Sequence, residues 1–288
     1  MGISDTSLKR ELERLYRTYD RAFLHTDPLE FVHRYKTARD REIVGLVASS
    51  LAYGRVEGIR RSVERVLRVM GASPYKFTIN FEPQSGGRLF SGFRHRFNDG
   101  DDITCLVYFA RQMLDECGSI GGFFLDCFSP GERNIKGALS AFSEKVLALD
   151  CAHVYGTKGL PGDAGVRFFF PSPRGGSPCK RLNLYLRWMV RGPDGLDFGI
   201  WKGVDPSMLV IPLDTHIARI SRNIGLTKRK SPDWKMAEEI TENLKVLDPG
   251  DPVKYDFSLC RLGILEKCAA RKDLRKCESC MIRKLCVL

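Results

Sequence analysis

The sequence predicts an all-α protein built as two helical lobes. In one stretch after another, apolar residues recur at intervals of three and four, which is the spacing of a buried helix face. Strand signals are scarce, and the predicted helices 7–24 and 255–267 have few neighbours in their own parts of the sequence. We therefore expect one helical domain over residues 28–213 and a second formed by residues 1–27 with 214–288.

The helices are predicted in chain order from their apolar faces. The first carries Leu8, Leu12, Leu15 and Tyr19 on one side, and the breaker Asp27-Pro28 follows it. Further helices are expected over residues 40–51, 59–70, 103–117, 135–149, 177–191, 215–226, 233–246 and 255–267. Residues 71–100 and 150–176 are predicted to be irregular, because both are rich in residues that break helices.

Composition points to a soluble protein that binds a polyanion. The chain has 288 residues and a net charge of +11. No stretch approaches eighteen apolar residues and the N-terminus is a charged helix rather than a signal peptide, so we expect no membrane contact. Ten cysteines without a secretion signal indicate a reducing compartment, and we expect a monomer in the cytoplasm, associated with the nucleoid.

Four cysteines near the C-terminus form the most specific motif. Cys268, Cys277, Cys280 and Cys286 follow the spacing C-x8-C-x2-C-x5-C. Four thiolates suit an iron–sulfur cluster or a structural zinc ion, whereas a disulfide staple belongs to small secreted chains. The surrounding residues 267–288 hold seven Lys/Arg against two acids, which favours a module that meets phosphates.

Other polar signals are open to two interpretations. Asp214 at the start of a predicted helix can simply cap that helix. The basic segments 174–191 and 219–230 contain no acid, and each can be either a solvated helix face or a phosphate contact. Arg88 and the cluster Arg94, His95 and Arg96 lie among Phe90, Phe93 and Phe97, so this loop can stack on nucleic acid or be pinned to the core by its rings.

The cysteine segment resembles the iron–sulfur loop of endonuclease III, in the helix-hairpin-helix DNA glycosylase superfamily, whose spacing is C-x6-C-x2-C-x5-C. Residues 213–217 with Arg219 resemble that family's V-D-T-H-x-x-R segment, and residues 179–183 resemble its R-K-T-A-N segment. Two departures mark a separate branch. Residues 170–178 replace the usual L-P-G-V-G hairpin, and the segment between Met70 and Gly176 is longer and does not align.

The resemblance implies a DNA repair protein of the base-excision type that acts on damaged double-stranded DNA. Asp214 falls on the family's catalytic aspartate, and Lys180 on the lysine of members with AP-lyase activity. Both are expected to face a cleft between the two lobes. The resemblance favours a 4Fe–4S cluster over zinc on the four cysteines. The residues expected to contact DNA are Gly175, Gly176, Ser177, Arg181, Arg187, Arg219, Arg222, Tyr53, Arg55, Lys272 and Lys276.

The expected roles follow from the chemistry of base removal. Cleavage of an N-glycosidic bond passes through a cation-like sugar, which an ionised carboxylate stabilises. A lysine amine can instead attack the sugar carbon and form a Schiff base. Two alternatives from other classes stay open: a non-catalytic nucleic-acid-binding or damage-sensing module with the same fold, and a structural protein stabilised by zinc.

Overall fold

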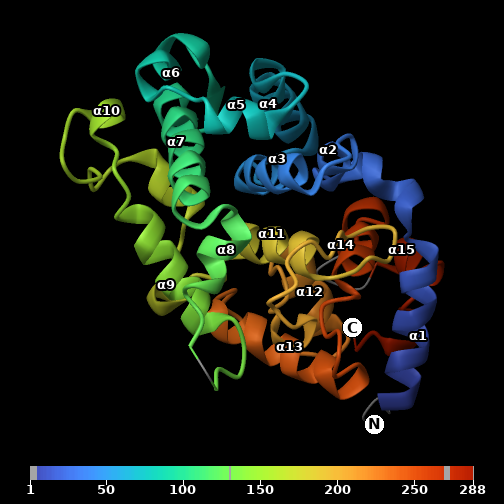
Figure 1. Cartoon of the computed structure of the whole chain (residues 1–288). Coiled ribbons are helices and arrows are strands. Elements are labelled where there is room, and N and C mark those ends of the chain that lie inside the picture. The colour runs from blue at the N-terminus through green and yellow to red at the C-terminus, as the bar shows by residue number, and fades with distance from the viewer. Residues whose placement is uncertain (1–4, 130, 269–272, 288) are drawn as a thin grey trace. The chain divides into compact units, whose positions relative to one another are not determined.

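The computed structural model describes residues 5–129, 131–268 and 273–287. This part of the chain is mostly helical, and its strands form one short antiparallel pair (Figure 1). The predicted all-α class is therefore confirmed. None of the described helices combines the length and the apolar character that a membrane span requires.

The chain divides into two compact units. The terminal unit comprises Met1–Leu24 and Gly176–Leu288, and the middle unit comprises His25–Gly175. The sequence prediction placed the second break at residue 213, so residues 176–213 lie in the terminal unit and not with the segment that precedes them.

The middle unit is a set of helices with one hairpin. Its elements are α2 (Leu29–His33), α3 (Ala38–Ser50), α4 (Val56–Met70), α5 (Pro74–Ile79), α6 (Pro83–Leu89), β1 (Arg94–His95), β2 (Asn98–Asp99), α7 (Gly100–Cys117), α8 (Ile120–Leu125), α9 (Lys136–Leu147), α10 (Ala152–Tyr155) and the 3-10 turns η2 (Gly165–Phe169) and η3 (Pro173–Gly175). A further turn, η1 (Arg21–Thr26), spans the first break.

Side-chain caps fix where the main helices of this unit begin. The Thr37 hydroxyl accepts a hydrogen bond from the Asp40 N–H at 3.0 Å and starts α3. At α7 the Asp99 carboxylate accepts from the N–H of Asp102, while the Asp102 carboxylate accepts from the N–H of Asp99, which is a capping box. These caps agree with the two helices predicted here.

Residues 71–100, expected to be irregular, contain α5, α6 and the hairpin. The prolines that argued against helix stand at helix starts, Pro74 in α5 and Pro83 in α6. Proline is tolerated there because the first N–H groups of a helix have no intrahelical partner.

The terminal unit joins the first helix to the last third of the chain. Its elements are α1 (Asp5–Thr18), α11 (Lys180–Val190), η4 (Pro206–Met208), α12 (Thr215–Asn223), α13 (Trp234–Leu247), α14 (Asp256–Leu265), α15 (Leu274–Glu278) and η5 (Arg283–Leu285). Helix α1 packs against α14, with the rings of Tyr16 and Tyr255 6.3 Å apart edge to face. This is the pairing expected for the predicted helices 7–24 and 255–267.

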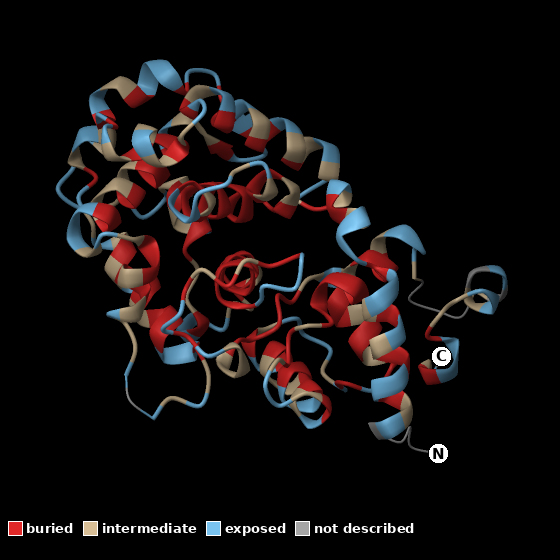
Figure 2. Ribbon diagram, turned by 45° about the vertical axis from the view of Figure 1, so that its right-hand side comes forward, coloured by how far each residue is buried: buried red, intermediate tan, exposed pale blue. Residues whose placement is uncertain are grey.

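Helix α11 is the most deeply buried element of the terminal unit. Every residue from Arg181 to Val190 is buried, which Figure 2 shows as a continuous red helix. Two buried arginines near its end are paired: Arg187 of α11 contacts the carboxylates of Asp197 and Asp256, and Arg191, the C-cap residue, lies 2.8 Å from both Asp197 and Asp251. A buried guanidinium requires such partners, so these ion pairs hold α11 in this unit.

Candidate functional site

Asp214 is the N-cap of α12. Its Oδ1 accepts hydrogen bonds from the N–H groups of His216 and Ile217, both at 2.8 Å. Its Oδ2 faces the Sγ of Cys260 on α14, 3.6 Å away. The capping role considered from the sequence is therefore present, and only one of the two carboxylate oxygens is used for it.

Helices α12 and α14 approach closely beside this carboxylate. A Cβ added at Gly263 of α14 would lie 2.7 Å from the Cβ of His216 and 2.9 Å from its Nδ1, so only glycine fits. The same Nδ1 lies 3.0 Å from a guanidinium nitrogen of Arg219. The segment that resembles V-D-T-H-x-x-R thus forms one contact group at the start of α12.

Lys180 is the first residue of α11 and is half-buried. The residue before it, Cys179, has a φ of 47°, a left-handed conformation that is uncommon for a residue other than glycine. Lys180 and Asp214 both belong to the terminal unit and not to different domains. The described contacts of the Asp214 carboxylate are with α12 and Cys260.

Three other C-terminal cysteines, Cys268, Cys277 and Cys286, lie near enough to Cys280 to influence its thiol. Burial raises the pKa of the Cys280 thiol, and the neighbouring thiols of Cys268, Cys277 and Cys286 raise it further. The backbone turns tightly here, since the N–H of Cys280 donates to the carbonyl of Cys277 at 3.3 Å. Among the described residues, no three of these sulfurs lie within 4.8 Å of one another.

Asn223, the last residue of α12, holds both ends of the cysteine segment. Its side-chain N–H₂ lies 3.8 Å from the Sγ of Cys268, and its carbonyl accepts from the N–H of Val287 at 2.8 Å. On the other side, Arg14 of α1 donates to the carbonyl of Met281. The segment is therefore anchored to α12 and α1, and Asn223 is a residue that sequence reasoning did not single out.

Two of the arginines expected to contact DNA are buried. Arg187 is 2% exposed and its guanidinium is engaged by Asp197 and Asp256. Arg181 is also buried, at 7%. A side chain enclosed in this way does not reach a phosphate, so neither position supports the expected contact. The sequence showed a basic run in residues 174–191. It did not show that acidic residues outside this run, such as Asp197 and Asp256, pair with some of its arginines.

The other expected contacts in the terminal unit are more accessible. Arg219 and Arg222 are half-buried, and Arg222 donates to the carbonyl of Lys230 at 3.2 Å. Gly176 is exposed with a φ of 80°, and the Ser177 hydroxyl accepts from the N–H of Cys179 at 3.2 Å. Of the remaining predicted positions, Gly175 is exposed in the middle unit, Lys276 belongs to α15 with its side chain outside the description, and Lys272 lies outside the described residues.

Tyr53 and Arg55, expected at a DNA-facing turn, line a cavity of about 620 Å³ in the middle unit. The cavity lies between the start of α4 and the hairpin of β1 and β2. Five arginines line it against a single acid, Glu57: Arg55, Arg61, Arg65, Arg94 and Arg96. The loop in which the sequence placed cations among aromatic rings therefore faces Tyr53 and Arg55.

A network of hydrogen bonds fixes the hairpin at this cavity. The buried His95 ring bonds the hydroxyl of Ser62 at 2.8 Å and the carbonyl of Tyr53 at 3.0 Å. The Tyr53 hydroxyl in turn donates towards the carbonyl of His95 at 2.9 Å and lies 2.5 Å from Oδ1 of Asn98. Asn98 extends the network to the carboxylate of Asp102 at 2.8 Å.

Three aromatic rings lie together next to the cavity. Phe97 and Phe168 meet edge to face with their ring centroids 4.6 Å apart, and Tyr53 is 5.6 Å from the first and 4.8 Å from the second. Phe97 is 53% exposed and Phe168 is 37% exposed. Phe168 begins the run Phe168-Phe169-Phe170, and the sequence offered no sign that this run lies beside Phe97.

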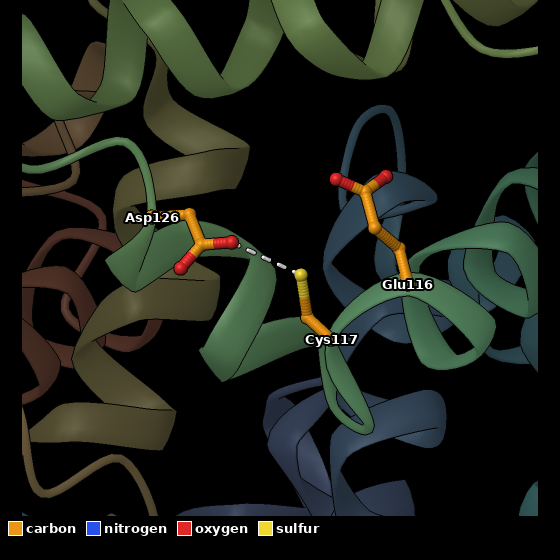
Figure 3. A group of neighbouring side chains, drawn as sticks. All are labelled: Glu116, Cys117 and Asp126. Carbon is orange, nitrogen blue, oxygen red and sulfur yellow. Dashed lines mark hydrogen bonds between the residues drawn. The ribbon is translucent and has the colours of Figure 1, made fainter.

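A third group, in the middle unit, brings together Glu116, Cys117 and Asp126 (Figure 3). Their ligand atoms lie within 4.8 Å of one another, which suits a metal ion in distance. The ammonium of Lys145, however, lies 2.7 Å from Glu116 and 3.8 Å from Asp126. Burial, followed by the hydrogen bond to Asp126, raises the pKa of Cys117 to about 11, so the thiol keeps its proton. We assign this group to an ion pair with lysine.

Comparison with known proteins gives a match to a family model. No curated protein and no solved structure matches the chain. Residues 27–265 match a family model described as a protein of unknown function, DUF2400, a span that contains Lys180, Asp214 and the arginine-lined cavity and ends before Cys268. Because the match covers most of its length, the chain belongs to the DUF2400 family.

Proposed function

We propose that the protein is a DNA repair enzyme of the base-excision type, which removes a damaged base from double-stranded DNA by cleaving the N-glycosidic bond. Asp214 is the residue assigned to stabilise the cation-like sugar. The observation that carries the proposal is that the two oxygens of this carboxylate have different contacts. Oδ1 is held by two backbone N–H groups, while Oδ2 meets only the Cys260 thiol among the described residues.

The chemistry assigned to Asp214 is electrostatic. As the bond between the sugar carbon and the base nitrogen breaks, its electron pair leaves with the base and positive charge develops on the sugar. A carboxylate fixed by its own helix needs no reorganisation to oppose that charge. Water then forms the new bond to the sugar carbon and loses a proton to solvent.

Lys180 is assigned the accompanying lyase step. Its Nζ electron pair attacks the sugar carbon of an abasic site, water leaves, and an imine links protein and DNA. The half-buried position of Lys180 at the first turn of α11 supports this role, because the side chain starts from a fixed helix end. Borohydride reduces such an imine to a stable amine, which makes the step directly observable.

We propose a 4Fe–4S cluster on Cys268, Cys277, Cys280 and Cys286. The support for a cluster is the spacing of the four cysteines, whose last two intervals match those of the iron–sulfur loop that the segment resembles. Four thiolates can also hold one zinc ion, so metal analysis decides between the two. A cluster bound there supplies four covalent anchors for the C-terminal segment, and the chemistry stays with Asp214 and Lys180.

The experiment that tests the enzymatic proposal is borohydride trapping on a duplex that carries one abasic site, with base release measured on damaged duplexes. The parent protein is expected to form a trapped complex, and Lys180→Gln is expected to lose it while base release persists. Lys202→Gln is the matched control, because Lys202 is an exposed lysine of the same unit. Equal trapping by Lys180→Gln and the control would remove Lys180 from the proposal.

A second candidate function has an observation in its favour. Asp214 is engaged as a helix cap through Oδ1, and its Oδ2 faces the Cys260 thiol. This arrangement also fits a non-catalytic nucleic-acid-binding or damage-sensing module with the same fold. The two candidates differ in one result: the module binds DNA but shows neither trapping nor base release.

A further inference from the structure

We propose that the arginine-lined cavity of the middle unit binds a phosphodiester of single-stranded nucleic acid, with an adjacent unstacked base lying on Phe97 and Phe168. This site goes beyond the function proposed above. It uses no residue of the terminal unit, and it does not require Asp214 or Lys180 to be catalytic.

The charge of the cavity is the first argument. Five arginines surround it with a single carboxylate, and Arg55, Arg61, Arg94 and Arg96 are exposed. None of these four forms an ion pair with any residue that the structure describes. Arginine presents a planar fork of donors that matches phosphate oxygens. Unneutralised arginines converging on one hollow are therefore typical of a site for a phosphate-bearing ligand.

Arg65, which also lines the cavity, has a structural role. Its guanidinium donates to the carbonyls of Gly92 at 2.9 Å and Ser91 at 2.7 Å, which ties α4 to the chain leading into the hairpin. Together with the two hydrogen bonds of His95, this contact holds the cavity wall in one arrangement. The other arginines are thereby presented from a rigid frame, which lowers the cost of ordering them on a ligand.

The backbone N–H groups at the start of α4 add partial positive charge to the cavity. Helix α4 begins at the cavity, its N-cap Arg55 offers no side-chain acceptor, and Glu57 and Gly58 of its first turn line the hollow. The first N–H groups of a helix carry partial positive charge. A Cβ added at Gly58 would meet no atom within 4 Å, so there is open space beside this turn.

The exposed rings of Phe97 and Phe168 form the part of the site that holds the base. Phe97 follows Arg96 in the hairpin, and its ring is more than half exposed although it is fully apolar. Rings at a surface beside cations are typical of proteins that hold single strands, where each base offers a face for stacking. In a duplex those faces are covered by neighbouring bases, so the pair of rings favours an unpaired segment.

The test measures binding of the full-length protein to a fluorescent single strand of about ten nucleotides and to the matching duplex. Phe97→Ala is expected to weaken single-strand binding by roughly 5- to 150-fold, the range of one lost base stack. Phe97→Tyr, which keeps the ring, is expected to restore it. Duplex binding through the terminal unit should change far less.

The phosphate contact is tested on one helix with a matched pair. Arg61→Gln removes an exposed charge inside the cavity, and Arg68→Gln removes an exposed charge two turns further along α4, outside it. The first variant is expected to weaken single-strand binding and to reduce the slope of log affinity against log salt by about 0.7, the value for one phosphate of a single strand. The second is expected to match the parent.

Three results would overturn the site. These are parent-like binding by Phe97→Ala and Arg61→Gln, equal weakening of duplex and single strand by Phe97→Ala, and full competition by a nucleoside monophosphate at the same nucleotide concentration. The last would show a pocket for free nucleotides instead of a strand. Asp214→Asn is expected to leave single-strand binding unchanged, so failure of the enzymatic proposal and failure of this site are distinguishable.

Discussion

The thiol of Cys260 on α14 lies 3.6 Å from Oδ2 of Asp214, the oxygen that the α12 backbone does not use. Burial, with the negative charge of Asp214 added to it, raises the pKa of Cys260 to about 12, so the thiol keeps its proton and can donate it to that oxygen. One carboxylate thus contacts two helices. A test of Asp214 has to separate this structural contribution from chemistry.

Comparison of Asp214→Asn with Asp214→Ala separates the structural contribution of Asp214 from its proposed catalytic role. Asparagine caps a helix as well as aspartate, so Asp214→Asn is expected to keep the urea midpoint close to that of the parent while abolishing base release. Asp214→Ala loses the cap and is expected to cost about 1 kcal/mol of stability in addition. Urea unfolding and base-release rates measure the two effects. Full activity of Asp214→Asn would leave capping as the only function of this residue.

Two glycine substitutions are expected to have opposite effects on stability. Gly263→Ala forces a Cβ to within 2.7 Å of His216 and is expected to destabilise by about 1–3 kcal/mol. Gly87→Ala in α6 meets no atom within 4 Å and is expected to stabilise by about 0.5–1 kcal/mol, because alanine loses less backbone entropy in a helix. Thermal unfolding of both variants checks the signs. A neutral Gly263→Ala would mean that α12 and α14 separate without cost.

Low pH is expected to lower the stability of the terminal unit, because Asp194 becomes protonated. Burial opposes its ionisation, but Arg191, the Tyr16 hydroxyl and the N–H groups of Asp197 and Leu196 together lower its pKa to about 2 from an ordinary 3.8. The stability that this carboxylate contributes is therefore present above about pH 3.8 and lost as the pH falls towards 2. Asp194→Asn, measured by urea unfolding between pH 2 and 6, is expected to flatten that part of the profile. An unchanged slope would contradict the assignment.

The proposed cluster predicts that replacing two different cysteines has different effects on metal content. Cys277→Ser is expected to lose iron, acid-labile sulfide and the visible absorbance of the cluster. Cys117→Ser is the matched control, because Cys117 lies in the ion-paired group of the middle unit and is expected to leave metal content unchanged. Zinc in the parent protein, in place of iron, would instead favour the structural zinc alternative.

Much of the fold was predictable because its long helices carry regular apolar faces. The expected helix at 40–51 is α3 at Ala38–Ser50, and the one at 233–246 is α13 at Trp234–Leu247. The hairpin was not predictable, because each of its strands has two residues and its stability comes from Tyr53 and Ser62, which are distant in sequence. Short elements of this kind leave no periodicity to detect.

The candidate site was predictable only in part for a similar reason. The spacing of the four cysteines is a local pattern, so the sequence alone is enough to single out this segment. Whether a basic residue is free depends on partners elsewhere, and Arg187 is paired with Asp256, sixty-nine positions away. Arg61 belongs to the cavity only because the hairpin folds against α4, a contact that no local motif reveals.

Helix α12 has a different structural contact at each of its two ends. It has nine residues and is about 14 Å long, with the carboxylate of Asp214 at its start and the anchor of the cysteine segment, Asn223, at its finish. A helix of this length is marginal by itself, so its order depends on those attachments and on α14. Conditions that loosen the C-terminal segment, such as oxidation of its thiols, are therefore expected to loosen the residues around Asp214 as well. In hydrogen exchange the amides of α12 should report the state of a motif that begins forty-five positions beyond Asn223.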